Sequence, residues 1–196
     1  MKKYKTGLVL GRFQTFHKGH EYIINKALEI CDKVLVFIGS SDKSGTIENP
    51  FSYELREKLI KKIYGNEIVE NKLIISPLAD LGAGNVTKWG DYLFCEAEKI
   101  LRKVDCIVYG KESKCKSWFS EKIKKSVNFI VISRDDIKIN ASTLREYMRK
   151  NDFESWKKFV NEKAQIFFSE GYTFGKNGEG FERINLAVPT RILEEG

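Results

Sequence analysis

Short apolar runs alternate along the chain with longer stretches in which apolar and polar residues repeat at helical spacing. The runs are rich in β-branched residues and comprise Thr6–Leu10, Val34–Ile38, Leu73–Ile75, Cys106–Tyr109 and Phe129–Ile132. The helix-like stretches are 18–31, 52–64, 89–103 and 116–125, followed by 142–150 and 153–162. Strands that are apolar along their whole length and alternate with helices are typical of a parallel sheet covered on both faces. We therefore predict an α/β fold with a Rossmann-like parallel sheet, helices on both of its faces and right-handed crossovers.

The amino-acid composition of the chain changes after about residue 165. Four glycines fall within ten residues, at positions 171, 175, 178 and 180, and Phe and Tyr residues lie between them. Such a composition favours hairpin-like or extended structure over another helix. We therefore predict two parts, an α/β domain over residues 1–165 and a short C-terminal appendage over residues 166–196.

Composition and charge narrow the classes of protein to consider. Of the 196 residues, 42% are hydrophobic, enough for a core, and the formal charge of +7 favours an anionic partner, either nucleic acid or a phosphate-rich small molecule. The four cysteines, Cys31, Cys95, Cys106 and Cys115, form no C-x-x-C pair, so we expect small core hydrophobes and no zinc site. The sequence has neither a signal-peptide pattern nor an apolar run approaching the roughly 18 residues of a membrane span. A cytoplasmic location is expected.

The first apolar run leads into the segment GRFQTFHKGH, Gly11–His20, and a helix-like stretch follows. Both histidines of the chain, His17 and His20, lie in this segment. In an open α/β sheet, ligands bind beyond the carboxyl ends of the strands, and a helix N-terminus there offers N–H groups and a positive dipole end to phosphate. Gly19 permits close approach of the backbone to a ligand. The segment therefore predicts a phosphate-binding turn.

This segment closely resembles the H-x-G-H signature of the nucleotidylyltransferase superfamily. It is most similar to the G-R-F-Q-P-F-H-x-G-H form in archaeal-type nicotinamide-nucleotide adenylyltransferases, with Thr15 where the family has Pro. The resemblance implies transfer of AMP from ATP to nicotinamide mononucleotide (NMN), giving NAD and pyrophosphate. It implies that His17 and His20 bind the ATP phosphates and stabilise the transition state, and that Arg12 neutralises negative charge. Three further residues of the segment would contact ATP: Gly11, Phe13 and Gly19.

Two further blocks resemble the acceptor side of the same family. The first runs from Ile38–Ser41 to Glu48–Ser52 and on to Arg56, and it matches the family's G-S-A/S loop, N-P-F-[TS] and helical arginine. Ser44-Gly45 stands where the family has Ser-His, so one histidine is missing, and Ser52 is expected to cap the following helix. The second block contains Pro77–Leu81, Asn85 and Trp89. The resemblance implies that Ser40, Asp80 and Asn85 hold NMN and that Trp89 stacks on its cationic ring.

The remaining block, Ile139–Arg145, resembles the superfamily's I-S-x-T-x-I-R signature, with Asn140 where Ser is usual. We expect Ser142 to cap the helix. The resemblance implies that Asn140, Ser142 and Thr143 cradle an ATP phosphate and that Arg145 neutralises its charge.

The lysine-rich stretch 109–126 is typical of a solvated helix face. It begins where the superfamily has its adenine-binding loop, so Gly110 and Lys111 are candidates for contact with ATP.

The tail resembles a different family. Residues 171–191 are similar to the C-terminal end of a PLP-dependent aminotransferase or cystathionine β-lyase, in which the position of Arg183 would bind a substrate carboxylate. A stretch of about 30 residues is too short for that fold, and its Schiff-base lysine is absent. We therefore expect no PLP, and we expect a chain shortened after Asn161 to remain folded and active.

The leading hypothesis is an NMN adenylyltransferase that uses Mg²⁺ held mainly by the nucleotide and water, with no protein ligand to the metal. An alternative is another nucleotidylyltransferase, with pantetheine phosphate, FMN or a cytidylyl acceptor. A third hypothesis is a nucleic-acid-binding or regulatory protein without turnover, which the charge permits. The sequence carries no recognised RNA-binding signature, so we expect no nucleic-acid or membrane partner. Formation of a homo-oligomer is compatible with the sequence.

Overall fold

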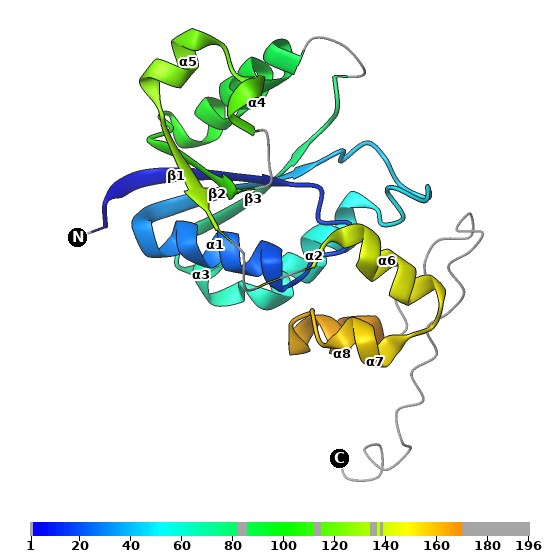
Figure 1. The fold of residues 1–196 in the computed structure, drawn as a ribbon. Helices are drawn as coiled ribbons and strands as arrows, with labels where there is room; N and C mark the ends of the chain where they lie inside the picture. The colour runs from blue at the N-terminus through cyan, green and yellow to red at the C-terminus, as the bar shows by residue number, and fades with distance from the viewer. Residues whose placement is uncertain (1, 82–85, 112–114, 134–136, 138, 170–196) are drawn as a thin grey trace.

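The computed structural model describes residues 2–81, 86–111, 115–133, 137 and 139–169 (Figure 1). The strands are β1 (Tyr4–Gly11), β2 (Cys31–Gly39), β3 (Leu73–Leu78), β4 (Cys106–Gly110) and β5 (Asn128–Ile132). The helices are α1 (Lys18–Ile30), α2 (Tyr53–Ile63), α3 (Gly65–Val69), α4 (Val86–Leu101), α5 (Glu121–Ser126), α6 (Ala141–Arg149), α7 (Phe153–Lys157) and α8 (Glu162–Ser169). A short 3₁₀ helix, η1 (Cys115–Trp118), precedes α5.

The five strands form one parallel sheet in the order β3-β2-β1-β4-β5. Helices α1 and α2 lie on one face of the sheet, and α4 and α5 lie on the other (Figure 1). These arrangements confirm the predicted Rossmann-like α/β class. The strand order reverses between β1 and β4, and such a switch point is where open α/β sheets bind ligands, beyond the carboxyl ends of the strands.

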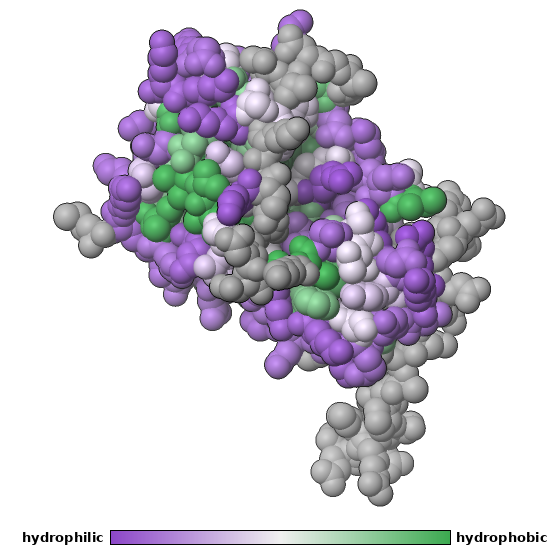
Figure 2. Space-filling view, viewed as in Figure 1, coloured by the Kyte–Doolittle hydropathy of each residue, from purple (hydrophilic) through white to green (hydrophobic). Residues whose placement is uncertain are grey.

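The sheet separates two apolar clusters, which explains why its strands are apolar without alternation. From β2, Val34, Val36 and Ile38 pack with residues of α1 and α2, whereas Leu35 and Phe37 pack with residues of α4. All five side chains are at most 1% exposed. Burying each contributes on the order of 1.5–3 kcal/mol. Hydrophobic residues also gather on the surface over the edge strand β5 (Figure 2), where Val131 is 52% exposed.

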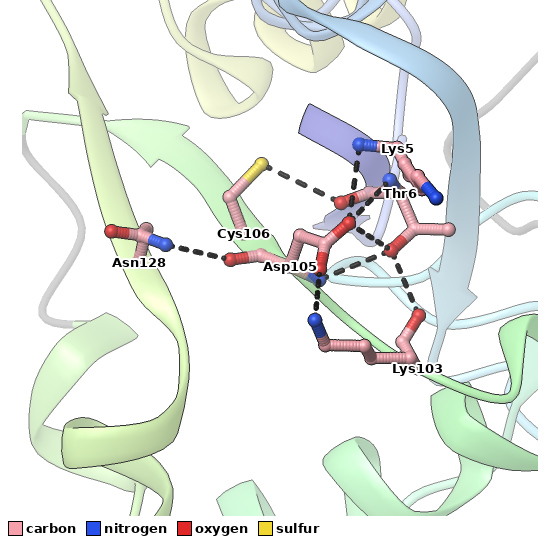
Figure 3. Close-up of polar contacts among 6 residues, drawn as sticks. All are labelled: Lys5, Thr6, Lys103, Asp105, Cys106 and Asn128. Atoms are coloured by element: carbon pink, nitrogen blue, oxygen red, sulfur yellow. Dashed lines mark hydrogen bonds and ion pairs between the residues drawn. The ribbon is translucent and has the colours of Figure 1, made fainter. Parts of the chain in front are cut away.

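A polar network fixes the amino-terminal edge of the sheet, opposite the predicted ligand site. Oδ2 of Asp105 accepts hydrogen bonds from the backbone N–H groups of Lys5 and Thr6, both at 3.1 Å. Lys103 pairs with the same carboxylate at 2.9 Å, and the Asn128 side chain donates to the carbonyl of Asp105 at 3.1 Å (Figure 3). These contacts join β1, β4 and β5 and so set their register.

Two predicted helices are each divided in the structure. The stretch 116–125 consists of η1 and α5, and the stretch 153–162 consists of α7 followed by the start of α8. Between η1 and α5, the buried Phe119 is 1% exposed and the N–H of Ser120 donates to Asp91 of α4. At the second break, the side chain of Asn161 accepts from the N–H of Lys163. Such side-chain acceptors compete with helical hydrogen bonds and begin a new helix.

Helix α8 extends to Ser169, where the sequence predicted extended structure from residue 166 onward. Ala164 is fully buried in the cluster shared with α2, and the Lys163 ammonium donates to the carbonyl of Ile63 at 3.2 Å. The α/β domain therefore includes α8, and a chain ending at Asn161 lacks this helix and its buried Ala164. That such a chain remains folded and active stays a prediction. Residues 170–196, with the aminotransferase-like segment, lie outside the described residues, and the division into domain and appendage stays a prediction.

Three of the four cysteines, Cys31, Cys106 and Cys115, are buried as predicted, whereas Cys95 on α4 is exposed. The Sγ atoms of Cys31 and Cys106 lie 3.4 Å apart in the core. Within the described part of the chain, no helix combines the length and the apolar character needed to cross a membrane.

Candidate active site

The signature segment forms a buried loop between the end of β1 and the start of α1. Its residues 13–17 are each 1–2% exposed. Phe13 has a φ of +52°, a conformation that residues other than glycine seldom adopt and that surrounding contacts must hold. A Cβ atom on Gly11 would lie 2.7 Å from the Phe13 ring, so only glycine fits beside the folded-back aromatic side chain. In this structure Gly11 and Phe13 shape the loop.

The two histidines lie side by side at the N-terminus of α1. His17 is the N-cap, and its Nδ1 accepts a hydrogen bond from the N–H of Gly19 at 3.1 Å. Because Nδ1 is the acceptor, the proton of the neutral imidazole is on Nε2, the nitrogen that can donate to a phosphate oxygen. The His20 ring stacks on the His17 ring with centroids 3.7 Å apart, and the Phe13 ring contacts it edge-on at 4.9 Å. Both imidazoles are therefore held at the dipole end that favours anions.

The signature loop is fixed to two distant parts of the chain through Gln14. Its side-chain amide donates to the carbonyl of Phe51 at 2.8 Å and accepts from the N–H of the same residue at 2.9 Å. The Arg145 guanidinium donates to the carbonyl of Gln14, and also to the Ser142 hydroxyl at 3.1 Å. Burial, and then the nearby Arg12, lower the pKa of Arg145. Arg145 thus joins α6 to the loop through one guanidinium nitrogen, while a second nitrogen holds the group against Ser142 of its own helix.

The cap of α6 differs from the prediction. Asn140 has extended backbone angles and its side chain accepts from the N–H of Thr143 at 2.9 Å, so Asn140 is the N-cap. Ser142 already lies in the first helical turn and cannot cap the helix, so that prediction was wrong. The exposed Ser142 and the half-buried Thr143 flank the start of α6. The predicted cap of α2 is confirmed, because the Ser52 hydroxyl accepts from the N–H of Leu55.

A second buried arginine, Arg56 of α2, lies beneath the ends of β1 and β2. It is 2% exposed, and its guanidinium donates to the carbonyls of Arg12, Gly39 and Ser40 at 2.7, 2.8 and 3.0 Å. Burial lowers the pKa of Arg56 to about 10, so the group is charged at neutral pH. The sequence identified Arg56 only as part of a pattern, and nothing local in the sequence indicates these carbonyl partners.

Two of the residues predicted to hold NMN contact one another at the end of β2. Ser40 has a φ of +47°, and its hydroxyl donates to Asp80 at 3.0 Å. The Lys43 ammonium forms an ion pair with the same carboxylate at 2.7 Å. A third predicted NMN residue, Asn85, lies outside the described residues. The loops after β2 and β3 thus bring a hydroxyl, a carboxylate and an ammonium group together at the carboxyl edge of the sheet.

Trp89 lies in the first part of α4, half-buried, and contacts Trp118 of η1 edge-on with ring centroids 5.3 Å apart. Packing against Trp118 thus covers part of the indole surface, and the stacking of Trp89 on NMN stays a prediction.

Gly110 ends β4 and is buried, while the exposed Lys111 follows it and donates its N–H to the carbonyl of Ile132. Gly110 and Lys111 are therefore at the same carboxyl edge as the signature loop.

The side chains near the signature loop are mainly cationic. Arg12 is exposed, and its charge acts on Arg145, Arg56 and Lys43. In the part of the chain that the structure describes, no group of three or more His, Cys, Asp or Glu side chains could hold a metal ion. Arginines, helix N-termini and adjacent imidazoles suit a polyphosphate ligand.

Comparison with known proteins agrees with this geometry. A family model described as cytidylyltransferase-like matches residues 8–169. The nicotinamide-nucleotide adenylyltransferase of Thermococcus kodakarensis is 30% identical over 185 residues, which cover 93% of this chain and 88% of the relative. That of Thermoplasma acidophilum is 31% identical over 121 residues, covering 62% of this chain and 63% of the relative.

Among solved structures, a bifunctional NMN adenylyltransferase/ADP ribose pyrophosphatase from Francisella tularensis, complexed with AMP and a manganese ion, superposes with a TM-score of 0.60. It is 25% identical, and the match covers 84% of this chain and 52% of that protein. The chain thus spans under two thirds of the Thermoplasma relative and about half of the Francisella protein. The predicted superfamily is confirmed. The chain belongs to the cytidylyltransferase-like family of nucleotidylyltransferases, within its archaeal-type nicotinamide-nucleotide adenylyltransferase branch.

Proposed function

We propose that this chain catalyses the transfer of AMP from ATP to NMN, with NAD and pyrophosphate as products. The observation that carries the proposal is the pair of stacked imidazoles, His17 and His20, at the N-terminus of α1 beside the switch point of the sheet. The names of the Thermococcus and Thermoplasma relatives support NMN as the acceptor.

The reaction needs a single displacement. A phosphate oxygen of NMN attacks the α-phosphorus of ATP and forms a new P–O bond, while the bond from the α-phosphorus to the bridging oxygen breaks. The electron pair of that bond leaves with pyrophosphate, and no covalent bond to the enzyme is needed. Negative charge spreads over the transferring group and the leaving oxygens, so catalysis consists of positioning and electrostatic stabilisation.

In this proposal the histidines act on the charge that develops at the α-phosphorus. Nε2 of His17 donates to a phosphate oxygen, because Nδ1 is engaged with Gly19. His20, stacked on His17, donates to a neighbouring oxygen. Arg12, exposed at the end of β1, neutralises the leaving pyrophosphate, and Arg145 adds positive charge from beneath the loop that it supports.

The other predicted residues are divided between the two substrates. The ATP side comprises Gly11, Phe13, Gly19, Gly110, Lys111, Asn140, Ser142 and Thr143. Because the Asn140 side chain caps α6, the groups offered to a phosphate there are N–H groups of the first turn and the hydroxyls of Ser142 and Thr143. The NMN side comprises Ser40, Asp80, Asn85 and Trp89. The carboxylate of Asp80 accepts from polar hydrogens of NMN, and the Trp89 indole attracts the pyridinium ring.

A divalent cation accompanies ATP in this proposal, and we assign it as Mg²⁺. When bound, Mg²⁺ supplies positive charge to the phosphate oxygens. The described residues near the loop are arginines, histidines and hydroxyls and not a carboxylate cluster, so they suit a cation held by phosphate oxygens and water. The manganese ion in the Francisella structure is consistent with a divalent metal in such enzymes.

The test is a turnover screen of ATP and CTP against NMN, nicotinate mononucleotide, FMN and phosphopantetheine. We expect the highest kcat/KM for ATP with NMN, and loss of that activity in His20→Ala as a control for contaminating enzymes. A cytidylyl donor, or FMN or phosphopantetheine as the best acceptor, would favour another member of the family. A cooperatively melting chain that turns over none of these pairs but binds oligonucleotides with a steep salt dependence would instead be a nucleic-acid-binding protein.

A further inference from the structure

The ends of β1 and β2 share one buried cation. The last paired residues of the two strands are Gly11 and Ile38. Directly beyond them, the carbonyls of Arg12, Gly39 and Ser40 all accept from the guanidinium of Arg56, at 2.7–3.0 Å. Nε of Arg56 donates to the carbonyl of Ser52 at 3.1 Å, which fixes the guanidinium plane against the N-terminus of its own helix.

The carbonyls that Arg56 holds belong to both halves of the proposed site. Arg12 is assigned to the ATP phosphates, whereas Ser40, through its contact with Asp80, is assigned to NMN. A single planar group thus hydrogen-bonds the backbone that presents the donor nucleotide and the backbone that presents the acceptor. Ser40 also has a left-handed φ of +47°, and the bond from Arg56 to its carbonyl helps to hold this conformation.

We propose that Arg56 is a positioning residue that sets the distance and angle between the ATP-binding loop after β1 and the NMN-binding loop after β2. The inference rests on the proposed function. Arg56 is 2% exposed and its described hydrogen bonds go to backbone carbonyls, so it acts through those loops and does not touch substrate.

Only arginine has the shape that this role requires. The guanidinium is planar and presents five donors in a rigid fork, so it can bond carbonyls from two strands at once. A lysine keeps the charge but concentrates it on one nitrogen at the end of a flexible stem. Misplacing reacting groups by about 1 Å can lower a rate by about 100-fold. Arg56→Lys should therefore disturb the relative placement of the two subsites more than the contacts within each of them.

The matched control is Tyr64→Phe. Tyr64 is 4% exposed and ends the same helix, and its hydroxyl donates to Asn25 at 3.0 Å. It lies eight residues from Arg56, about 12 Å along the helix. The control therefore removes the hydroxyl that donates to Asn25 and to the carbonyl of Glu21, and it keeps the ring that packs edge-on against Phe16 of the signature loop.

The experiment combines steady-state kinetics with hydrogen exchange of wild type, Arg56→Lys, Arg56→Met and Tyr64→Phe. For Arg56→Lys we expect kcat to fall 10- to 100-fold, with the KM values for ATP and NMN each within about threefold of wild type. Backbone amides of residues 12–14 and 39–41 should exchange faster in both Arg56 variants and not in Tyr64→Phe. Arg56→Met should show the larger changes, because it also loses the charge.

Several results would overturn the proposal. The first two are kinetic: Arg56→Lys with wild-type kcat, or with a rise in only one KM at unchanged kcat. The third is unchanged hydrogen exchange in the two loops of the Arg56 variants. The fourth is non-cooperative melting of these variants, which would mean that Arg56 serves folding itself. If the wild type fails to convert NMN and ATP, the proposed function fails. The exchange data, which need no turnover, then decide alone whether Arg56 holds the two loops.

Discussion

His17 has two separable functions in this structure, and one substitution distinguishes them. Its Nδ1 caps α1 by accepting from Gly19, while its Nε2 is assigned to a phosphate oxygen. Replacing an N-cap acceptor by Ala costs about 1 kcal/mol, which for a domain of this size lowers Tm by about 2–4 °C. Asn is among the best N-cap residues, so His17→Asn should melt within about 1 °C of wild type.

Turnover should fall in both variants, whether or not the new residue caps the helix. Both His17→Ala and His17→Asn lose the Nε2 donor, and removing one such donor lowers kcat by about 100-fold, equivalent to about 2.7 kcal/mol in the barrier. The assay is thermal melting beside kcat and KM for NMN and ATP. We expect His17→Asn to recover the melting temperature and not the turnover. Recovery of both would mean that His17 is a capping residue alone, and the catalytic assignment would fail.

Three further predictions concern His20, Trp89 and the C-terminal part of the chain. His20→Ala should lower kcat about 100-fold with little change in KM for NMN, because its contact strengthens in the transition state; near-normal turnover in a folded variant would contradict its role. Trp89→Ala should weaken NMN by about 0.5–2 kcal/mol and spare ATP, whereas equal weakening of both would make Trp89 a packing residue. A chain ending at Ser169 should match the full chain in kcat/KM, whereas a chain ending at Asn161 loses the buried Ala164 and should melt at a lower temperature. Loss of turnover in a chain that ends at Ser169 and still melts cooperatively would show that the tail contributes to the site.

The sequence predicted best those structural features that a local pattern of residues determines. The apolar runs predicted all five strands, because a strand between two helical layers is buried on both faces and needs apolar residues throughout. The position of His17 and His20 between a strand and a helix predicted that they lie at the ligand edge of the sheet. Ser52 was predicted to cap α2 because capping is local.

Contacts between distant segments could not be predicted in this way. The partners of Gln14 are 37 and 131 residues away, at Phe51 and Arg145, and no local pattern specifies them. The same holds for Arg56, whose carbonyl partners become neighbours only once β1 and β2 have paired. The cap of α6 was missed by two residues, because both Asn140 and Ser142 are good caps and only the backbone decides.

The transfer itself is tested most directly by following two labels of ATP. The chain is incubated with NMN and with ATP labelled either at the α-phosphorus or at the γ-phosphorus, and the products are separated. We predict that the α label appears in NAD and the γ label in pyrophosphate, in equal amounts. The γ label on the acceptor would indicate phosphoryl transfer, and the α label in AMP or ADP without NAD would indicate hydrolysis. Either result would contradict adenylyl transfer.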